Sequence, residues 1–140
     1  MKLFMIVSSL FFSLNALASC PDLTGTYKGT YVSGQGVTEE IWRFEQKVEN
    51  STTVYTSYTD GVFDISFAAD GRTVDGYPTV TCKKDVLILD HPNSDDHNVK
   101  FQDQLTATSE YLQIVTKTFI PLVDGGIEVR YNLVRFPRIK

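Results

Sequence analysis

The side chains that could carry chemistry are few, and most of them gather in one polar loop. His91 and His97 flank Asp95 and Asp96 in this loop. His and carboxylate ligands can bind zinc or a similar divalent ion. Ligands on a loop rarely reach a fixed geometry without supporting residues, and the regular oxygen spacing of a calcium loop is missing. We therefore expect a solvated acidic loop and no metal ion.

Groups for acid–base or nucleophilic catalysis are not arranged for it. Glu39 and Glu40 are adjacent in an alternating segment, so their side chains point to opposite faces of a strand and cannot act together. The sequence contains no Gly-x-Ser-x-Gly elbow and no phosphate-binding glycine loop. We expect no enzyme and no cofactor.

The N-terminal segment is typical of an export signal. Lys2 is followed by an apolar run from Leu3 to Leu17 and then by small residues. This run is too short to span a bilayer comfortably as a permanent helix. We expect residues 1–18 to be removed and residues 19–140 to form the mature chain, with no transmembrane span.

Two ways of processing this signal have different consequences for the two cysteines. Ala16-Leu17-Ala18 fits cleavage before Ser19, after which Cys20 and Cys82 can form a disulfide in an oxidising compartment, periplasmic or secreted. Leu17-Ala18-Ser19-Cys20 instead resembles a lipobox, and lipid attachment at Cys20 would give a membrane-anchored lipoprotein with one unpaired thiol. The sequence leaves both alternatives open.

Length and charge restrict the fold and the partners. About 120 residues remain after processing, enough for one domain with a single core. The whole chain has 13 basic and 17 acidic side chains, for a net charge of −4. The signal segment contains one base and no acid, so the mature chain has a net charge of −5. We expect no nucleic-acid binding through the overall field of this acidic chain.

Apolar and polar residues alternate through most of the mature chain. Short alternating runs are separated by turn signals such as Asp60-Gly61 and Asp70-Gly71, and no helical period extends over two turns outside the signal. This pattern predicts an all-β domain, an antiparallel up-and-down barrel of eight or nine strands. Aromatic residues that could point into it are Tyr27, Tyr31, Trp42, Phe44, Phe63, Phe67, Phe101 and Tyr131.

The first strand also carries a resemblance to a known family. Leu23-Thr24-Gly25-Thr26-Tyr27 resembles the Gly-x-Trp opening of lipocalin-like barrels (calycins), with Tyr in place of Trp. The resemblance implies that Tyr27 closes one end of a barrel and that a basic residue near the last strand packs across it. Arg130 or Arg135 could be that residue. The opening also resembles small exported proteins of Gram-negative bacteria, which implies a location in the envelope.

Two functions are compatible with these observations. In the first, a small apolar or amphipathic ligand binds inside the barrel, as the lipocalin-like resemblance implies. In the second, side chains fill the barrel and the protein binds another envelope protein through a loop or an exposed strand face. An eight-stranded barrel has room for side chains or for one small ligand, so the volume of the interior distinguishes the two.

Overall fold

The computed structural model describes residues 20–33, 36–74, 76–92 and 98–140, with residues 31–33 described by their backbone alone. The predicted export signal lies outside the described residues. The described chain forms nine strands and no helix, as its alternating pattern predicts. The strands are β1 (Gly25–Ser33), β2 (Gly36–Glu49), β3 (Thr52–Thr59), β4 (Val62–Ala68), β5 (Thr79–Lys83), β6 (Val86–Asp90), β7 (Lys100–Ala107), β8 (Tyr111–Pro121) and β9 (Ile127–Ile139).

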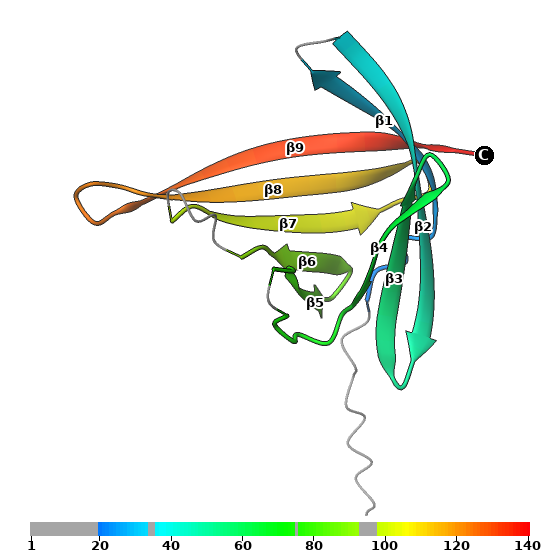
Figure 1. The fold of residues 1–140 in the computed structure, drawn as a ribbon, viewed down its shortest axis with the longest axis horizontal. Coiled ribbons are helices and arrows are strands. Elements are labelled where there is room, and N and C mark those ends of the chain that lie inside the picture. The colour runs from blue at the N-terminus through cyan, green and yellow to red at the C-terminus, as the bar shows by residue number, and fades with distance from the viewer. Residues whose placement is uncertain (1–19, 34–35, 75, 93–97) are drawn as a thin grey trace, which may run out of the picture.

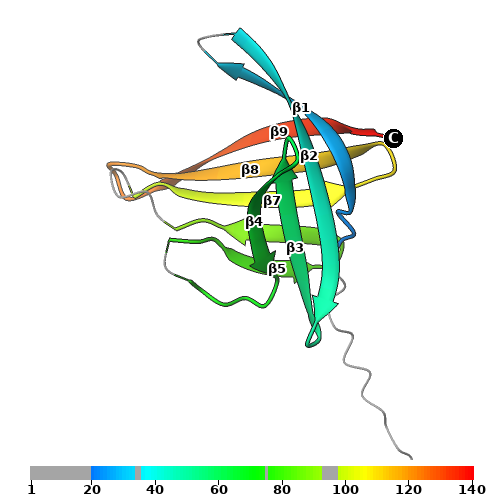
Figure 2. The same ribbon diagram turned by 45° about the vertical axis from the view of Figure 1, so that its right-hand side comes forward.

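All nine strands belong to one antiparallel sheet, in the order β4-β3-β2-β1-β9-β8-β7-β6-β5. The sheet bends strongly, so that β2 and β3 run across the direction of β7, β8 and β9 (Figure 1). The two halves are joined where Thr26 and Tyr27 of β1 pair with Ile139 and Arg138 of β9. Figure 2 shows the same crossing from a second direction.

This topology confirms the predicted all-β class and the antiparallel up-and-down barrel in a single domain. Successive strands are neighbours in the sheet except β4 and β5, which form its two ends. The barrel therefore has a seam between these two strands. The segment that connects them begins with the Ala69 amide donating to the Thr53 carbonyl (2.9 Å), and the Gly71 amide then donates to the Val80 carbonyl (2.9 Å).

The connecting segment differs from the sequence-based expectation. The Asp70-Gly71 pair predicts a hairpin whose second strand runs from Arg72 to Tyr77, and Gly71 does take the positive φ (72°) that such a turn needs. The described residues from Arg72 to Pro78 are irregular, however, and β5 begins only at Thr79. Pro78 cannot donate to a ladder, which limits pairing at this point.

The core lies where the two halves of the sheet cross. It consists of apolar side chains from both halves, all with at most 6% of their surface exposed: Leu23, Tyr27, Phe44, Tyr55, Val80, Leu87, Leu105 and Leu112. Leu112 on β8 faces Phe136 on β9, which also packs against this cluster. Even-numbered positions of β8 and β9 therefore face inward and odd-numbered positions face outward.

Candidate functional site

A disulfide joins the first described residue to β5, at one end of the sheet. Cys20 and Cys82 are bonded, with their Cα atoms 5.1 Å apart and a separation of 62 in the sequence. This confirms the predicted pairing. A sulfur atom in a disulfide cannot also carry a lipid. A disulfide of this kind is typical of an oxidising compartment outside the cytoplasm.

Two buried tyrosines bind the backbone of the segment that follows Cys20. The Tyr55 hydroxyl donates to the Pro21 carbonyl (2.7 Å), and the Tyr27 hydroxyl donates to the Leu23 carbonyl (3.0 Å). The Gln46 side chain accepts a hydrogen bond from the Leu23 amide (3.3 Å). Each bond satisfies a polar group that burial would otherwise leave without a partner. Residues 21–24, which we call the plug, are therefore held in an ordered conformation at this end of the barrel.

Arg138 packs across the plug from the last strand. Its guanidinium donates to the Tyr27 hydroxyl (2.8 Å) and to the Thr24 carbonyl (3.0 Å), and its central carbon lies 5.1 Å from the centroid of the Tyr27 ring. A Cβ at Gly25 would lie 2.9 Å from an Arg138 nitrogen. Gly25 also has a φ of 154°, which other residues rarely adopt, so a substitution there would strain the backbone and displace the guanidinium.

The choice of Arg130 or Arg135 as the basic residue beside Tyr27 is wrong. Arg130 pairs with Glu128 (2.7 Å), and Arg135 donates to Gln113 (3.0 Å). The strand register is the reason, because it places position 138 directly opposite Tyr27. Sequence reasoning anticipated the kind of contact but could not choose among the arginines of β9 without this register.

The plug tyrosines are held neutral. Burial raises the pKa of the Tyr27 hydroxyl, although the charge of Arg138 partly opposes this effect. Burial also raises the pKa of Tyr55 well above its ordinary value. Both hydroxyls therefore keep their protons at neutral pH and act as hydrogen-bond donors, a structural role.

Replacing Arg138 by methionine is expected to destabilise the fold by about 1–3 kcal/mol, because the Tyr27 hydroxyl and the Thr24 carbonyl each lose a charged donor. Arg72→Met is the matched control, since that side chain is 84% exposed and pairs with Asp70 on the connecting segment. Urea unfolding of both variants measures the difference. Equal stability of the two variants would contradict the role given to Arg138.

The aromatic residues predicted to line the barrel divide into two groups. Tyr27 and Phe44 are buried, and Trp42 and Phe67 are partly buried against the core. The Trp42 ring stacks on Phe136, with the centroids 4.7 Å apart. These rings fill the crossing region between the two halves of the sheet. The side chain of Tyr31 lies outside the described residues.

Three of the predicted lining residues do not enter the core. Phe63 is 59% exposed because the register shifts between Ser57 and Tyr58, and this irregularity places Phe63 opposite Tyr58. Tyr131 is 68% exposed on the outward side of β9. Phe101 lies on the same side of β7 as the core residue Leu105, but near the start of the strand it is 38% exposed and lines an open depression. The prediction that the rings point into the interior is therefore wrong for Phe63 and Tyr131, and Phe101 faces inward without entering the core.

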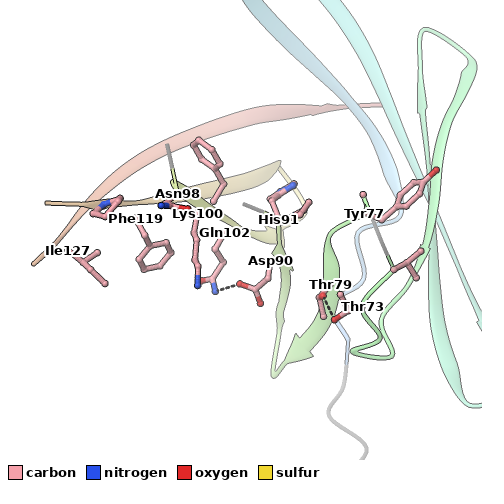
Figure 3. Close-up of a pocket in the computed structure, with 15 residues that line it drawn as sticks. Thr73, Tyr77, Thr79, Asp90, His91, Asn98, Lys100, Gln102, Phe119 and Ile127 are labelled. Atoms are coloured by element: carbon pink, nitrogen blue, oxygen red, sulfur yellow. Dashed lines mark hydrogen bonds between the residues drawn. The ribbon is translucent and has the colours of Figure 1, made fainter. Parts of the chain in front are cut away.

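Two open depressions lie at the rim of the barrel rather than inside it. One, of about 560 Å³, follows the seam between β4 and the connecting segment. Its apolar lining includes Phe63, Ile65, Phe67, Val74, Tyr77 and Val80. The other, of about 750 Å³, lies around the end of β6, between the connecting segment and the β8–β9 hairpin (Figure 3).

His91, from the start of the polar loop, lines this second depression and belongs to a small hydrogen-bonded cluster. Its Nε2 is hydrogen-bonded to one carboxylate oxygen of Asp103 (2.8 Å), and the Thr116 hydroxyl donates to the other oxygen (2.6 Å). The rest of the predicted loop cluster, residues 93–97, lies outside the described residues. Among the described residues, no three His, Cys, Asp or Glu side chains gather in a way that could hold a metal ion.

The outward side chains of β8 and β9 form the most apolar exposed surface of the described chain. We call the odd-numbered positions of 111–121 and 127–137 the outer β8–β9 face. It includes Ile127, Tyr131 and Leu133, which are 67%, 68% and 54% exposed. Its charged members are Lys117, which lies over Tyr131, and Arg135, which lies over Tyr111. None of its side chains is acidic.

This face carries a signal that sequence reasoning noticed and misassigned. Ile127, Val129, Tyr131 and Leu133 do share one side of β9, as the alternation predicts. This side of β9 faces away from the core, to which β9 contributes Phe136 at an even-numbered position, so its apolar residues are exposed. The apolar side of a strand is thus not always the buried side.

The described residues include no helix long and apolar enough to cross a bilayer. Comparisons with protein-family models, with curated proteins and with solved structures found no match to this chain.

Proposed function

We propose that the protein is an exported interaction module that binds another polypeptide on its outer β8–β9 face, in the periplasm or outside the cell. The observation that carries this proposal is the distribution of apolar side chains. Four of the fifteen large hydrophobic residues found exposed in the described chain, Ile127, Val129, Tyr131 and Leu133, follow one another on this face along β9. Contiguous exposed apolar surface of this kind is typical of interaction sites.

The interior supports binding outside the barrel. Large side chains, including Tyr27, Tyr55 and Leu112, occupy the crossing region and are completely buried. The depressions of several hundred cubic ångströms lie at the rim and are open. These buried side chains support binding outside the barrel rather than at its centre, so we assign binding, without catalysis, to the outer surface.

The charge of the face indicates the chemistry of its partner. Lys117 and Arg135 are the charged residues of the face, whereas the mature chain as a whole has a net charge of −5. A positive apolar face on an acidic protein favours a partner segment with both acidic and apolar side chains. The acidic side chains of such a partner would be repelled by the negative charge of the remaining surface and attracted to Lys117 and Arg135 on this face.

Photo-crosslinking from single positions tests the proposal. A photoreactive phenylalanine replaces Tyr131 in the exported protein, and Val48, which is 70% exposed on β2, is the control position. We expect one discrete adduct with an acidic envelope polypeptide from position 131, and none from position 48. We also expect Lys117→Glu to reduce its yield several-fold. Identical adducts from both positions, or a yield that Lys117→Glu leaves unchanged, would contradict the proposal.

A small apolar ligand in the seam depression is the second candidate function. Phe63 and Phe67, two of the residues predicted from sequence to contact a ligand, line this depression together with Tyr77. Its floor reaches Val80, a core residue. A ligand would then lie between the two ends of the sheet and not on the barrel axis. This candidate requires a bound small molecule, whereas the interaction module does not.

A further inference from the structure

The edge of β9 that faces away from β8 is largely without a strand partner. β9 pairs with β8 from Ile127 to Pro137, but it pairs with β1 only at Arg138 and Ile139 among the described residues. In both views the β1–β2 hairpin diverges from β9 and leaves a wedge between them (Figures 1 and 2). An edge of this length is a template for another strand.

The direction of the backbone groups along this edge follows from one hydrogen bond. The Arg138 amide donates to the Glu110 carbonyl (2.7 Å), on the β8 side. The β8–β9 register is continuous, so the even-numbered residues of β9 direct their backbone groups toward β8. The odd-numbered residues Ile127, Val129, Tyr131, Leu133 and Arg135 therefore direct theirs toward the open edge.

We propose that a second copy of this chain adds its own β9 to this edge, antiparallel and centred on Val129. In this register Val129 lies opposite the partner's Val129, and Ile127 lies opposite the partner's Tyr131. The odd-numbered residues then exchange backbone hydrogen bonds across the twofold axis. Such an interface is isologous and closes as a dimer.

Charge complementarity selects this register. Glu128 lies opposite the partner's Arg130, and Arg130 lies opposite the partner's Glu128, so two opposite-charge pairs form across the strands. Shifting the centre to Arg130 would place two arginines directly opposite each other, which is unfavourable. Shifting it to Tyr131 would leave Glu128 opposite an apolar residue. In the single chain Glu128 and Arg130 pair with each other while exposed to solvent, so they are available for this exchange.

Pairing uses the edge of β9 and leaves the outer β8–β9 face open. The two faces would become one continuous surface, so the dimer extends the proposed function by doubling the area that a partner can contact. The dimer does not depend on that function. Its charged pairs, Glu128 and Arg130, point to the inward side of β9, opposite to the outer β8–β9 face. Their substitution therefore tests the dimer without changing the outer face.

Sedimentation equilibrium of the mature protein over a range of concentrations tests the proposal. We expect a dimer whose dissociation constant rises about tenfold or more in Glu128→Arg, because two opposite-charge pairs become like-charge pairs. The double variant Glu128→Arg with Arg130→Glu should restore association, since it exchanges the charges and keeps them opposite. Glu45→Arg is the matched control, because Glu45 belongs to an exposed pair with Arg43 on β2. It should leave the dissociation constant unchanged.

Hydrogen exchange provides a second readout at the edge itself. The amides of Ile127, Val129 and Tyr131 should gain protection as the concentration rises, whereas those of Glu128 and Arg130 are already protected by β8. A single copy at every concentration, or a Glu128→Arg variant that associates like the wild type, would overturn the proposal. Failure of the double variant to restore association would overturn it as well. None of these results would affect crosslinking of another polypeptide at position 131, which tests the proposed function separately.

Discussion

Replacing both Cys20 and Cys82 by serine is expected to lower the free energy of unfolding by about 4 kcal/mol. The disulfide closes a loop of 62 positions, and loss of this constraint increases the entropy of the unfolded chain by roughly that amount in the chain-entropy account. The plug should also loosen, because Cys20 begins the segment that the two buried tyrosines hold. Urea unfolding followed by circular dichroism measures the change.

Reduction of the wild-type protein is the control for this prediction. A reductant should lower the stability of the wild type to nearly that of the double serine variant and should leave the variant itself unchanged. If the double variant unfolds at the same urea concentration as the oxidised wild type, the disulfide does not stabilise the fold as described. If the reductant destabilises the variant too, the loss does not arise from this bond.

Leu112→Ala is expected to destabilise the protein by about 2–5 kcal/mol, whereas Leu133→Ala should change its stability by less than about 0.5 kcal/mol. The two leucines lie on adjacent strands, but Leu112 is completely buried in the crossing region and Leu133 is 54% exposed on the outer β8–β9 face. Removing the first side chain leaves a cavity in the core. Removing the second takes away surface that is already in contact with water.

The comparison of these two leucines determines which side of the β8–β9 hairpin is the inside. Guanidinium unfolding of both variants, measured at low concentration so that association does not contribute, gives the two free energies. A larger loss in Leu133→Ala than in Leu112→Ala would show that the sides of the hairpin are reversed. The filled core and the outer face would then both be assigned incorrectly.

The amino-acid sequence contained enough information to predict the strands and the first part of the core. Leu23 and Tyr27 are buried as the alternation of the first strand predicts, and Phe44 faces the core from β2. Strand alternation identifies the two sides of each strand. These predictions succeeded because β1 and β2 lie in the crossing region, where the apolar side is covered.

The same reasoning failed where the apolar side of a strand is not its buried side. Tyr131 belongs to an apolar alternation on β9, but this side faces away from the core, and alternation in a single sequence does not show which of the two sides is covered. Phe63 was misplaced by one irregularity of register between β3 and β4. The role of Arg138 required the pairing of β1 with the last strand, which is a contact between the two ends of the chain.

Native mass spectrometry of the exported and purified protein tests most directly whether side chains fill the barrel and leave the binding to its outer surface. We predict the mass of the processed chain, or of its dimer, with the two cysteines oxidised and no small molecule bound. A non-covalent adduct that dissociates on gentle activation would show that the protein carries a ligand, and it would contradict the account of a filled interior with its partners outside.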